Sequence, residues 1–270
     1  MDYSIKGTSV ILHQPDFDLD ETLDCGQAFR WKKIDSDYKC TYTGKFLNDE
    51  LTVSQTENCF IFHNISEKDF LDKWFEYFDF GTDYSELKKI FSQDETLAKA
   101  CKYAKGIRLL KQDSWECLIS FIISQNNNIP RIKGIIQRLC DNYGGNFPTA
   151  QALSQESPES LAYLRSGFRA RYICDASQKV NSGEVNLTKI SSMPLEQART
   201  ELKKITGVGD KVAECVLLYG MHRTEAFPVD VWIKRVLAEY YPNGLPEYIS
   251  ADAGIAQQYL FHYMRTAVSV

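Results

Sequence analysis

The sequence predicts an α+β fold, in which a β-rich antiparallel N-terminal part packs on a predominantly helical remainder. Short segments rich in β-branched and aromatic residues, separated by turn residues, occupy the first quarter of the chain. From residue 67 onward the apolar residues recur at intervals of three and four, beginning with EKDFLDKWFEYF. These two periodicities indicate strands first and helices afterwards. A chain of 270 residues with 44% hydrophobic content is long enough to bury a substantial core.

The strand-like segments predict an antiparallel meander made of residues 38–46, 50–55 and 58–63. The helical periodicity predicts further helices at residues 114–125, 129–142, 158–165, 170–181, 194–204, 210–220, 230–240 and 252–266. Ser114 is a candidate N-cap for the first of them, and Gly144-Gly145 would end the next. We therefore divide the chain into a β-rich domain of residues 1–95 and a helical domain of residues 96–270. The boundary falls between residues 80 and 100.

The charge of the chain is unevenly distributed. Its formal net charge is −5, but residues 101–240 carry 19 Lys and Arg against 14 Asp and Glu. A protein polarised in this way can place its basic half on a phosphate backbone while the acidic half faces away. Moderate asymmetry is also common in proteins that bind no nucleic acid, so the charge alone does not identify a partner.

The cysteine pattern predicts neither a metal site nor a disulfide framework. The eight cysteines are scattered, with no CxxC pair and no close Cys/His cluster. Mostly buried thiols in a reducing compartment fit this pattern better. The sequence also contains no apolar run of membrane-spanning length, and its first residues lack a signal-peptide pattern. We expect an intracellular protein without a membrane segment.

The sharpest local pattern is LKKITGVGDKVAECVLLYG, residues 202–220. Gly207, Val208 and Gly209 predict a tight turn between two helices, with the apolar side chain placed between them. Such a turn presents backbone N–H groups at a helix N-terminus, which suits a DNA phosphate. The segment resembles a helix-hairpin-helix, spanning about residues 195–220. An ordinary helical hairpin with a glycine-rich turn is the alternative.

Two residues near this hairpin are candidates for chemistry. Lys211 lies in the first turn of the second predicted helix, where the positive end of the helix dipole disfavours the charged amine. A neutral amine is the form in which lysine acts as a nucleophile. Asp230 precedes the next predicted helix, so a structural role as the N-cap of that helix is the alternative to a catalytic one. One helix and a short return separate the two, so they could face a single cleft.

With these residues, five segments of the chain resemble one family. GVGDKVAEC followed by PVDVW looks like the catalytic signature of the helix-hairpin-helix glycosylases. The other segments are CGQAFRW at 25–31, SQNNNIPRI at 124–132, GFRARY at 167–172 and AGIAQQYLF at 253–261. Together they resemble 8-oxoguanine DNA glycosylases with AP lyase activity, from about residue 20 to residue 261. The resemblance implies a β-rich N-terminal subdomain packed on a helix-hairpin-helix glycosylase core.

The resemblance also implies roles for residues that contact the damaged base. The carbonyl of Gly26 would accept a hydrogen bond from N7–H, a donor that 8-oxoguanine has and guanine lacks. Gln257 would bind the Watson–Crick edge, with an amide that both donates and accepts. Phe261 would stack on one face of the base and Cys215 would lie on the other. A turn glycine and ordinary core packing are the alternatives for Gly26, Phe261 and Cys215.

Further implied contacts concern the rest of the DNA. Asn126 would fill the gap left by the extruded nucleotide, while Arg131 and Arg169 would contact the opposite cytosine. Arginines bound to solvent or phosphate are the alternative. Two departures from the family stand near the site. Trp232 replaces a histidine that contacts a phosphate in animal-type enzymes, and Tyr219 stands where methionine is common, which is expected to reshape one wall of the base pocket.

The reaction implied by the resemblance is base removal and strand nicking in base excision repair. Asp230 would stabilise the sugar as the base departs, and Lys211 would attack C1′ to give a Schiff base that permits β-elimination. No cofactor and no metal are expected. We expect damaged double-stranded DNA as the partner, no membrane, a monomeric protein, and a location inside the cell with the genome, in the cytoplasm or nucleoid if the source is bacterial.

Three rival interpretations stay open at this point. Another glycosylase of the superfamily is the nearest, although the four-cysteine iron–sulfur loop of several members is absent after Cys215, and alkylated-base members lack the hairpin lysine. A non-catalytic DNA-binding module would not need Lys211 and Asp230 together. A globular protein unrelated to DNA fits the negative charge but not five motifs in one order.

Overall fold

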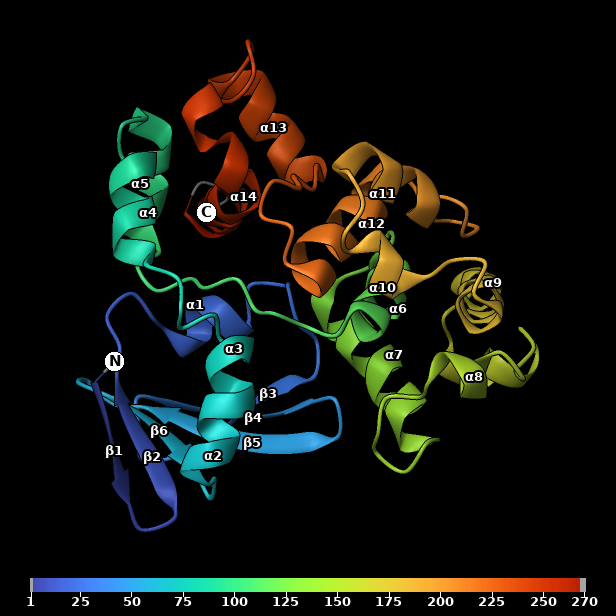
Figure 1. Ribbon diagram of the computed structural model, residues 1–270, viewed down its shortest axis with the longest axis horizontal. Helices are drawn as coiled ribbons and strands as arrows, with labels where there is room; N and C mark the ends of the chain where they lie inside the picture. Colours follow the sequence, from blue (N-terminus) through green and yellow to red (C-terminus); the bar gives the residue numbers. More distant parts are fainter. Residues whose placement is uncertain (1, 268–270) are drawn as a thin grey trace. The chain divides into compact units, whose positions relative to one another are not determined.

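The computed structural model describes residues 2–267, which form two compact units (Figure 1). Within these residues, unit 1 comprises the chain up to Lys111 and from Val229 onward, and unit 2 consists of Gln112–Pro228. These units differ from the division near residue 95 expected from the sequence. The C-terminal helices belong to unit 1 because they pack on a helix that follows the N-terminal sheet. Local periodicity predicts helices and strands, but it does not predict that the end of the chain returns to pack on an earlier helix.

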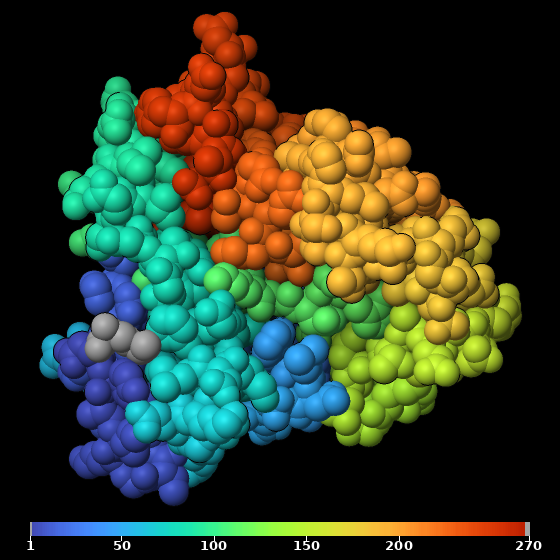
Figure 2. Space-filling view, viewed as in Figure 1, coloured from blue at the N-terminus to red at the C-terminus, as the bar shows by residue number. Residues whose placement is uncertain are grey.

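Unit 1 contains one six-stranded sheet, and every strand pairing in it is antiparallel. Its order is β1-β2-β6-β5-β4-β3. The strands are β1 (Asp2–Lys6), β2 (Ser9–His13), β3 (Trp31–Ile34), β4 (Cys40–Phe46), β5 (Asp49–Gln55) and β6 (Phe60–His63). The meander predicted from the sequence is confirmed as β4, β5 and β6, and the other three strands were not predicted. Strand β1 is an exposed edge, and its dark-blue atoms lie at the surface in Figure 2.

One face of this sheet is covered by an aromatic-rich helical segment. The predicted helical pattern after residue 66 forms α2 (Glu67–Asp69), a π-helical turn η1 (Phe70–Trp74) and α3 (Phe75–Tyr77), which lie across the sheet in Figure 1. Phe70 and Phe78 are fully buried against Phe62 of β6, and their rings meet that ring edge-on. Such contacts contribute roughly 0.5–1.5 kcal/mol each beyond burial.

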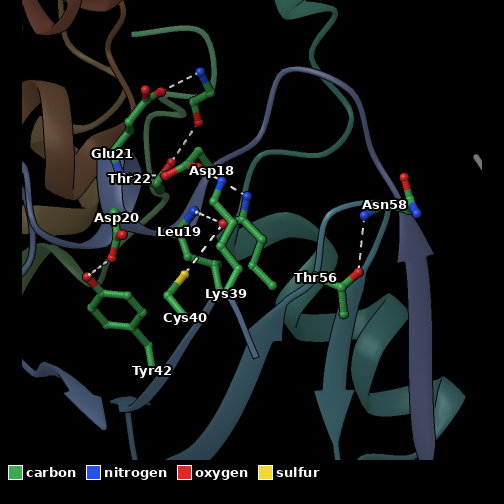
Figure 3. A network of polar contacts seen from close by, with 12 residues as sticks. Asp18, Leu19, Asp20, Glu21, Thr22, Lys39, Cys40, Tyr42, Thr56 and Asn58 are labelled. Atoms are coloured by element: carbon green, nitrogen blue, oxygen red, sulfur yellow. Dashed lines mark hydrogen bonds and ion pairs between the residues drawn. The ribbon is translucent and has the colours of Figure 1, made fainter. Parts of the chain in front are cut away.

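A short helix, α1 (Leu19–Leu23), joins the sheet to the rest of unit 1 through a polar network (Figure 3). Asp18 caps α1 by accepting a hydrogen bond from the backbone of Glu21, and it also pairs with Lys39 at 3.1 Å. Thr22 donates to the carbonyl of Gly106 at 2.9 Å. A side chain at Gly106 would clash with the Asp18 backbone, only 2.4 Å from its Cβ, so the glycine permits this close approach.

The remaining helices of unit 1 pack on one another. They are α4 (Tyr84–Phe91), α5 (Glu95–Tyr103), α13 (Val231–Tyr240), the 3₁₀ segment η4 (Glu247–Asp252) and α14 (Ala253–Thr266). Helix α14 contacts both α5 and α13. Its fully buried Tyr259 donates a hydrogen bond to the carbonyl of Ile107, at 3.1 Å, which ties α14 to the segment that follows α5. The helices predicted at 230–240 and 252–266 are confirmed.

Unit 2 is helical and is built around α6 (Ser114–Ser124), of which residues Cys117–Ile123 are all buried. Its other elements are α7 (Ile129–Asp141), α8 (Ala150–Leu153), η2 (Ser160–Leu164), α9 (Arg169–Ser182), α10 (Leu187–Ile190), α11 (Leu195–Leu202), α12 (Asp210–Cys215) and the π-helical η3 (Val216–Gly220). Each helix predicted in this region has a counterpart. Ser114 is not the N-cap of α6, because Asp113 has the extended backbone and accepts the hydrogen bond from the backbone of Glu116.

None of the helices within residues 2–267 has the length and hydropathy that crossing a membrane requires.

Candidate active site

The predicted hairpin lies in unit 2 between α11 and α12. Gly207 has a left-handed backbone, with φ of +83°, and a Cβ there would lie 2.3 Å from the Tyr172 ring of α9. Val208 is buried at 5% exposure, as expected for the apolar side chain of the turn. Gly209 is the N-cap of α12 and supplies no side-chain cap. The backbone N–H groups of the first turn are therefore left to a ligand or to solvent.

Lys211 lies in the first turn of α12, as predicted, and its side chain turns towards α6. Its Nζ lies 3.5 Å from the hydroxyl of Ser124 and 4.9 Å from the ring centre of Phe121. Tyr219 of η3 stacks on Phe121. The centres of the two rings are 5.2 Å apart, and their planes are inclined by 14°. Cys215, one turn after Lys211, is buried at 2% exposure. Unit 2 thus gathers the lysine, two stacked aromatic rings and a thiol within one helical cluster.

Asp230 is the N-cap of α13 in unit 1, which confirms the local structure predicted from the sequence. One carboxylate oxygen, Oδ1, accepts from the backbone N–H groups of Trp232 at 3.0 Å and Ile233 at 2.9 Å. Within the described residues, the other oxygen accepts no hydrogen bond. The carboxylate is therefore fixed in orientation while one oxygen stays available. Trp232 is half-buried, with the guanidinium of Arg235 placed 5.1 Å from its ring centre.

The three consecutive asparagines after α6 have different local roles. Asn128 caps α7 by accepting from the backbone of Arg131, and Asn127 donates to the carbonyl of Ile123 at 3.1 Å. Asn126 is exposed and has a left-handed backbone with φ of +46°. In the part of the chain that the structure describes, its side chain makes no hydrogen bond. Asn126 is thus the one asparagine of the three whose amide is not committed to local structure.

The two predicted cytosine-contacting arginines differ in exposure. The side chain of Arg131 is exposed, and its guanidinium makes one long hydrogen bond, of 3.4 Å, to the carbonyl of Arg165. Arg169 is only 3% exposed, and its guanidinium donates to the carbonyls of Gln125, Asn126 and Ser166. The sequence alone gave no sign of this difference.

The Gly26 loop of unit 1 is held by the residue that follows it. Gly26 has φ of +91°, in the left-handed region. Gln27 is 1% exposed, and its amide donates to the carbonyls of Thr22 at 2.9 Å and Arg108 at 2.8 Å. The same amide accepts from the backbone of Leu110 at 2.9 Å. Its donors and its acceptor are thus satisfied by backbone groups, which fixes the loop on both sides of Gly26.

Gln257 and Phe261 lie four residues apart on α14, so their side chains share one face of that helix, as predicted. Gln257 is buried at 2% exposure, and its amide oxygen accepts from Gln258 at 2.9 Å. Gln258 in turn accepts a long hydrogen bond, 3.6 Å, from the thiol of Cys25. A chain of side-chain contacts therefore links α14 to the loop that carries Gly26. Phe261 is half-buried, with Arg265 5.4 Å from its ring centre.

Sequence reasoning missed several residues of this region. Gln27 was not singled out, because nothing in its sequence neighbourhood signals burial of a glutamine. Phe121 and Ser124 fall within the helix predicted at residues 114–125, and only the fold places them beside Lys211. Phe168 is 41% exposed, and an aromatic residue directly before an arginine in the sequence is a signal that could have been used.

The thiols near these residues are held in their neutral form. Seven of the eight cysteines are buried, as predicted, and Cys59 is half-buried. Burial raises the pKa of Cys25 to about 11 and that of Cys101 to about 12. Burial also raises the pKa of Cys117, whose thiol donates to the carbonyl of Cys215 at 3.7 Å.

Comparisons with known proteins cover nearly the whole chain. The family model of the 8-oxoguanine DNA glycosylase N-terminal domain matches residues 9–118, and that of the HhH-GPD superfamily base excision DNA repair proteins matches residues 119–251. The N-glycosylase/DNA lyase of Saccharomyces cerevisiae is 36% identical over 182 residues, 57% of this chain. That match spans 48% of the length of the yeast protein.

Two solved structures match over almost their full length. One, MBOgg1 in complex with a low-affinity DNA ligand, is 41% identical with a TM-score of 0.90, over 98% of this chain and 99% of that one. The other is the 8-oxoguanine glycosylase/lyase of Clostridium acetobutylicum in complex with double-stranded DNA containing cytosine opposite 8-oxoG. It is 36% identical with a TM-score of 0.89, over the same shares of the two chains. The chain therefore belongs to the 8-oxoguanine DNA glycosylase/lyase family of the HhH-GPD superfamily of base excision repair.

Proposed function

We propose that this chain excises 8-oxoguanine from duplex DNA and then nicks the strand, with Lys211 as nucleophile and Asp230 as its carboxylate partner. The observation that carries the proposal is the position of Lys211. Its amine is placed at the start of a hairpin helix, beside a hydroxyl and over an aromatic ring, and among the described residues it forms no ion pair with a carboxylate. An amine that is not paired with a carboxylate is available for attack on an electrophilic carbon.

The first step is loss of the base. The bond between C1′ and the base nitrogen breaks with its electron pair leaving on the base, which takes up a proton. Positive charge develops on the sugar, and the free oxygen of Asp230 is suited to stabilise it electrostatically. The hydrogen bonds from the backbone of Trp232 and Ile233 keep that carboxylate from turning away.

The second step forms and resolves a covalent intermediate. The Lys211 amine bonds to C1′, and opening of the sugar ring gives a Schiff base between Nζ and C1′. Loss of a proton from C2′ then breaks the bond from C3′ to its phosphate oxygen, which nicks the strand 3′ to the lesion. Water hydrolyses the Schiff base and releases the lysine. Each step uses groups of the protein, the DNA and water.

Base recognition rests on the family resemblance and on the local structure that supports it. The carbonyl of Gly26 would accept from N7–H of the lesion, and the left-handed backbone there is maintained by the buried amide of Gln27. Gln257 would bind the Watson–Crick edge, while Phe261 and Cys215 would contact the two faces of the base. Extrusion of a nucleotide into such a pocket is general for enzymes that act on a base.

The remaining DNA contacts are assigned to unit 2. The uncapped start of α12, behind Gly207, Val208 and Gly209, would bind a backbone phosphate. The exposed amide of Asn126 would fill the space left in the stack, and the exposed Arg131 would contact the opposite cytosine. We expect the protein to act as a monomer inside the cell, where the genome is.

The test is covalent trapping on a duplex with one 8-oxoguanine opposite cytosine, in the presence of borohydride. Reduction of the Schiff base should give a stable protein–DNA band with the parent protein and none with Lys211→Gln. Lys189→Gln, at an exposed lysine of α10 in the same unit, is the matched control and should trap normally. An undamaged duplex should give no band. A folded parent protein that neither releases the base nor traps would refute the proposal.

A further inference from the structure

We propose that Glu214 is a positioning residue, which ties the helix that carries Lys211 to the segment of chain that leads to Asp230. The inference rests on the proposed function, because it concerns how the nucleophile and its carboxylate partner are positioned. Glu214 lies one turn after Lys211 on α12, and neither the two reaction steps nor base recognition uses it.

The carboxylate of Glu214 is buried, with only 7% of the residue exposed. Burying a carboxylate is unfavourable unless its charge and its lone pairs find partners. Here both oxygens have one: Oε1 accepts from Nε of Arg199 on α11, and Oε2 accepts from the backbone N–H of Phe227 at 2.6 Å. All three residues belong to unit 2. One side chain therefore joins the two helices of the hairpin to a third segment.

The third segment is not held by regular secondary structure. Residues 226–230 form neither helix nor strand. Residue 228 is a proline, which has no backbone N–H to donate, so the N–H of Phe227 is the last one before unit 2 ends. Asp230 follows Phe227 by three residues, a length of chain that spans at most about 10 Å. The bond from Phe227 to Glu214 therefore limits where the chain can place Asp230.

An ion pair that only holds α11 against α12 is the alternative role for Glu214. The bond to Phe227 argues against it, because this charge-assisted bond is directed at neither helix. Arg199 also pairs with Glu196 of its own helix, whose side chain is 84% exposed. Exposed pairs of this kind contribute little to stability. Glu196 and Glu214 thus share one arginine and differ in the contact with Phe227, which makes Glu196 the matched control.

A positioning role predicts a split between two reactions of the same protein. Single-turnover release of 8-oxoguanine uses the carboxylate of Asp230, whereas trapping on a preformed abasic site uses the Lys211 amine after the base has already left. Glu214→Gln keeps the size of the side chain but turns an NH2 group towards Arg199 or towards the N–H of Phe227. It should slow base release at least tenfold and borohydride trapping on the abasic duplex less than threefold. Equal losses in both reactions would overturn the inference, because they indicate a general loss of structure.

Coupling to Asp230 gives a second measurement. If Glu214 acts through Asp230, Glu214→Gln should slow base release less than twofold in a protein that already carries Asp230→Asn, because the charge that it positions is then absent. Fully multiplicative losses would contradict the inference. Glu196→Gln removes the other carboxylate partner of Arg199 and leaves the bond to Phe227 in place. It should change base release and trapping by less than twofold each.

Amide hydrogen exchange tests the same claim without activity. Glu214→Gln should speed exchange of the Phe227 amide at least tenfold, whereas Glu196→Gln should change it less than twofold. Unchanged exchange at Phe227 would refute the positioning role, even if the parent protein proved inactive on 8-oxoguanine and the proposed function failed. If Glu214→Gln does not fold, Glu214→Asp, which keeps the charge but is too short to reach both partners, is measured in the same way and with the same expected results.

Discussion

Replacement of Gln27 by leucine should destabilise unit 1 and weaken the choice of lesion over guanine. The amide of Gln27 is 1% exposed, and its partners at Leu110 and Arg108 are backbone groups of buried residues. Leucine of similar size removes the partner of the Leu110 N–H and of the Arg108 carbonyl, whereas the Thr22 carbonyl still accepts from the thiol of Cys25. Each such group costs about 1–3 kcal/mol. The free energy of unfolding should therefore fall by about 2–6 kcal/mol, a large part of a typical total.

Urea unfolding at 25 °C measures the first effect, and single-turnover excision of 8-oxoguanine and guanine from otherwise identical duplexes measures the second. The rate on 8-oxoguanine should fall at least about tenfold, with no matching fall on guanine, because the Gly26 carbonyl loses its fixed direction. Gln137→Leu, at an exposed glutamine of α7, is the control and should stay within about 0.5 kcal/mol. Gln27→Leu with parent stability and parent discrimination would refute the reasoning.

Three further predictions follow from other parts of the structure. Gly207→Ala should cost at least about 1–2 kcal/mol, because φ is +83° and the Tyr172 ring lies 2.3 Å from the new Cβ. Gly209→Ala, with open space at its Cβ, should cost about 1 kcal/mol or less; equal losses in urea unfolding would contradict this. Asp230→Asn should keep the stability, since both residues cap helices, but slow base release at least about 100-fold, and a near-parent single-turnover rate would exclude the carboxylate role. Burial raises the pKa of Asp18, but hydrogen bonds from Glu21, Lys39 and Gln55 more than offset it, so the pKa lies below its ordinary value. The resulting stabilisation is present above about pH 4 and is lost as the pH falls through the folded-state pKa. Asp18→Ala should therefore lose less stability on acidification in urea titrations, and an unchanged acid profile would count against the network.

Local periodicity was sufficient for the elements that carry their own amphipathic pattern. In β6 and in the middle of β4 and β5, buried side chains alternate with half-buried ones, and α7 shows apolar residues at intervals of three and four. Helix α1 is too short for such a pattern, and the hydrogen bond from Thr22 to Gly106, a contact distant in sequence, holds it in place. The π-helical turns η1 and η3 were also beyond prediction, since their widened hydrogen bonds leave the apolar spacing almost unchanged.

The site was predictable where a residue acts through its immediate neighbours. Asp230 as an N-cap and Lys211 in a first helical turn required only local reasoning. The burial of Gln27 and Arg169 was not predictable, because glutamine and arginine usually face solvent. Each also has partners more than forty residues away in the sequence, and only the folded chain shows that these backbone groups converge on it.

The buried thiols bear on how such an enzyme endures the conditions in which it is needed. 8-Oxoguanine arises when cells meet oxidants, and the same oxidants attack proteins at thiolates. A thiol with a pKa near 11, as at Cys25, is ionised in only about one molecule in ten thousand at pH 7. The cysteine beside the Gly26 loop is thereby kept almost inert towards peroxide. The loop that carries Gly26 is thereby protected at this cysteine under the conditions that produce the lesion.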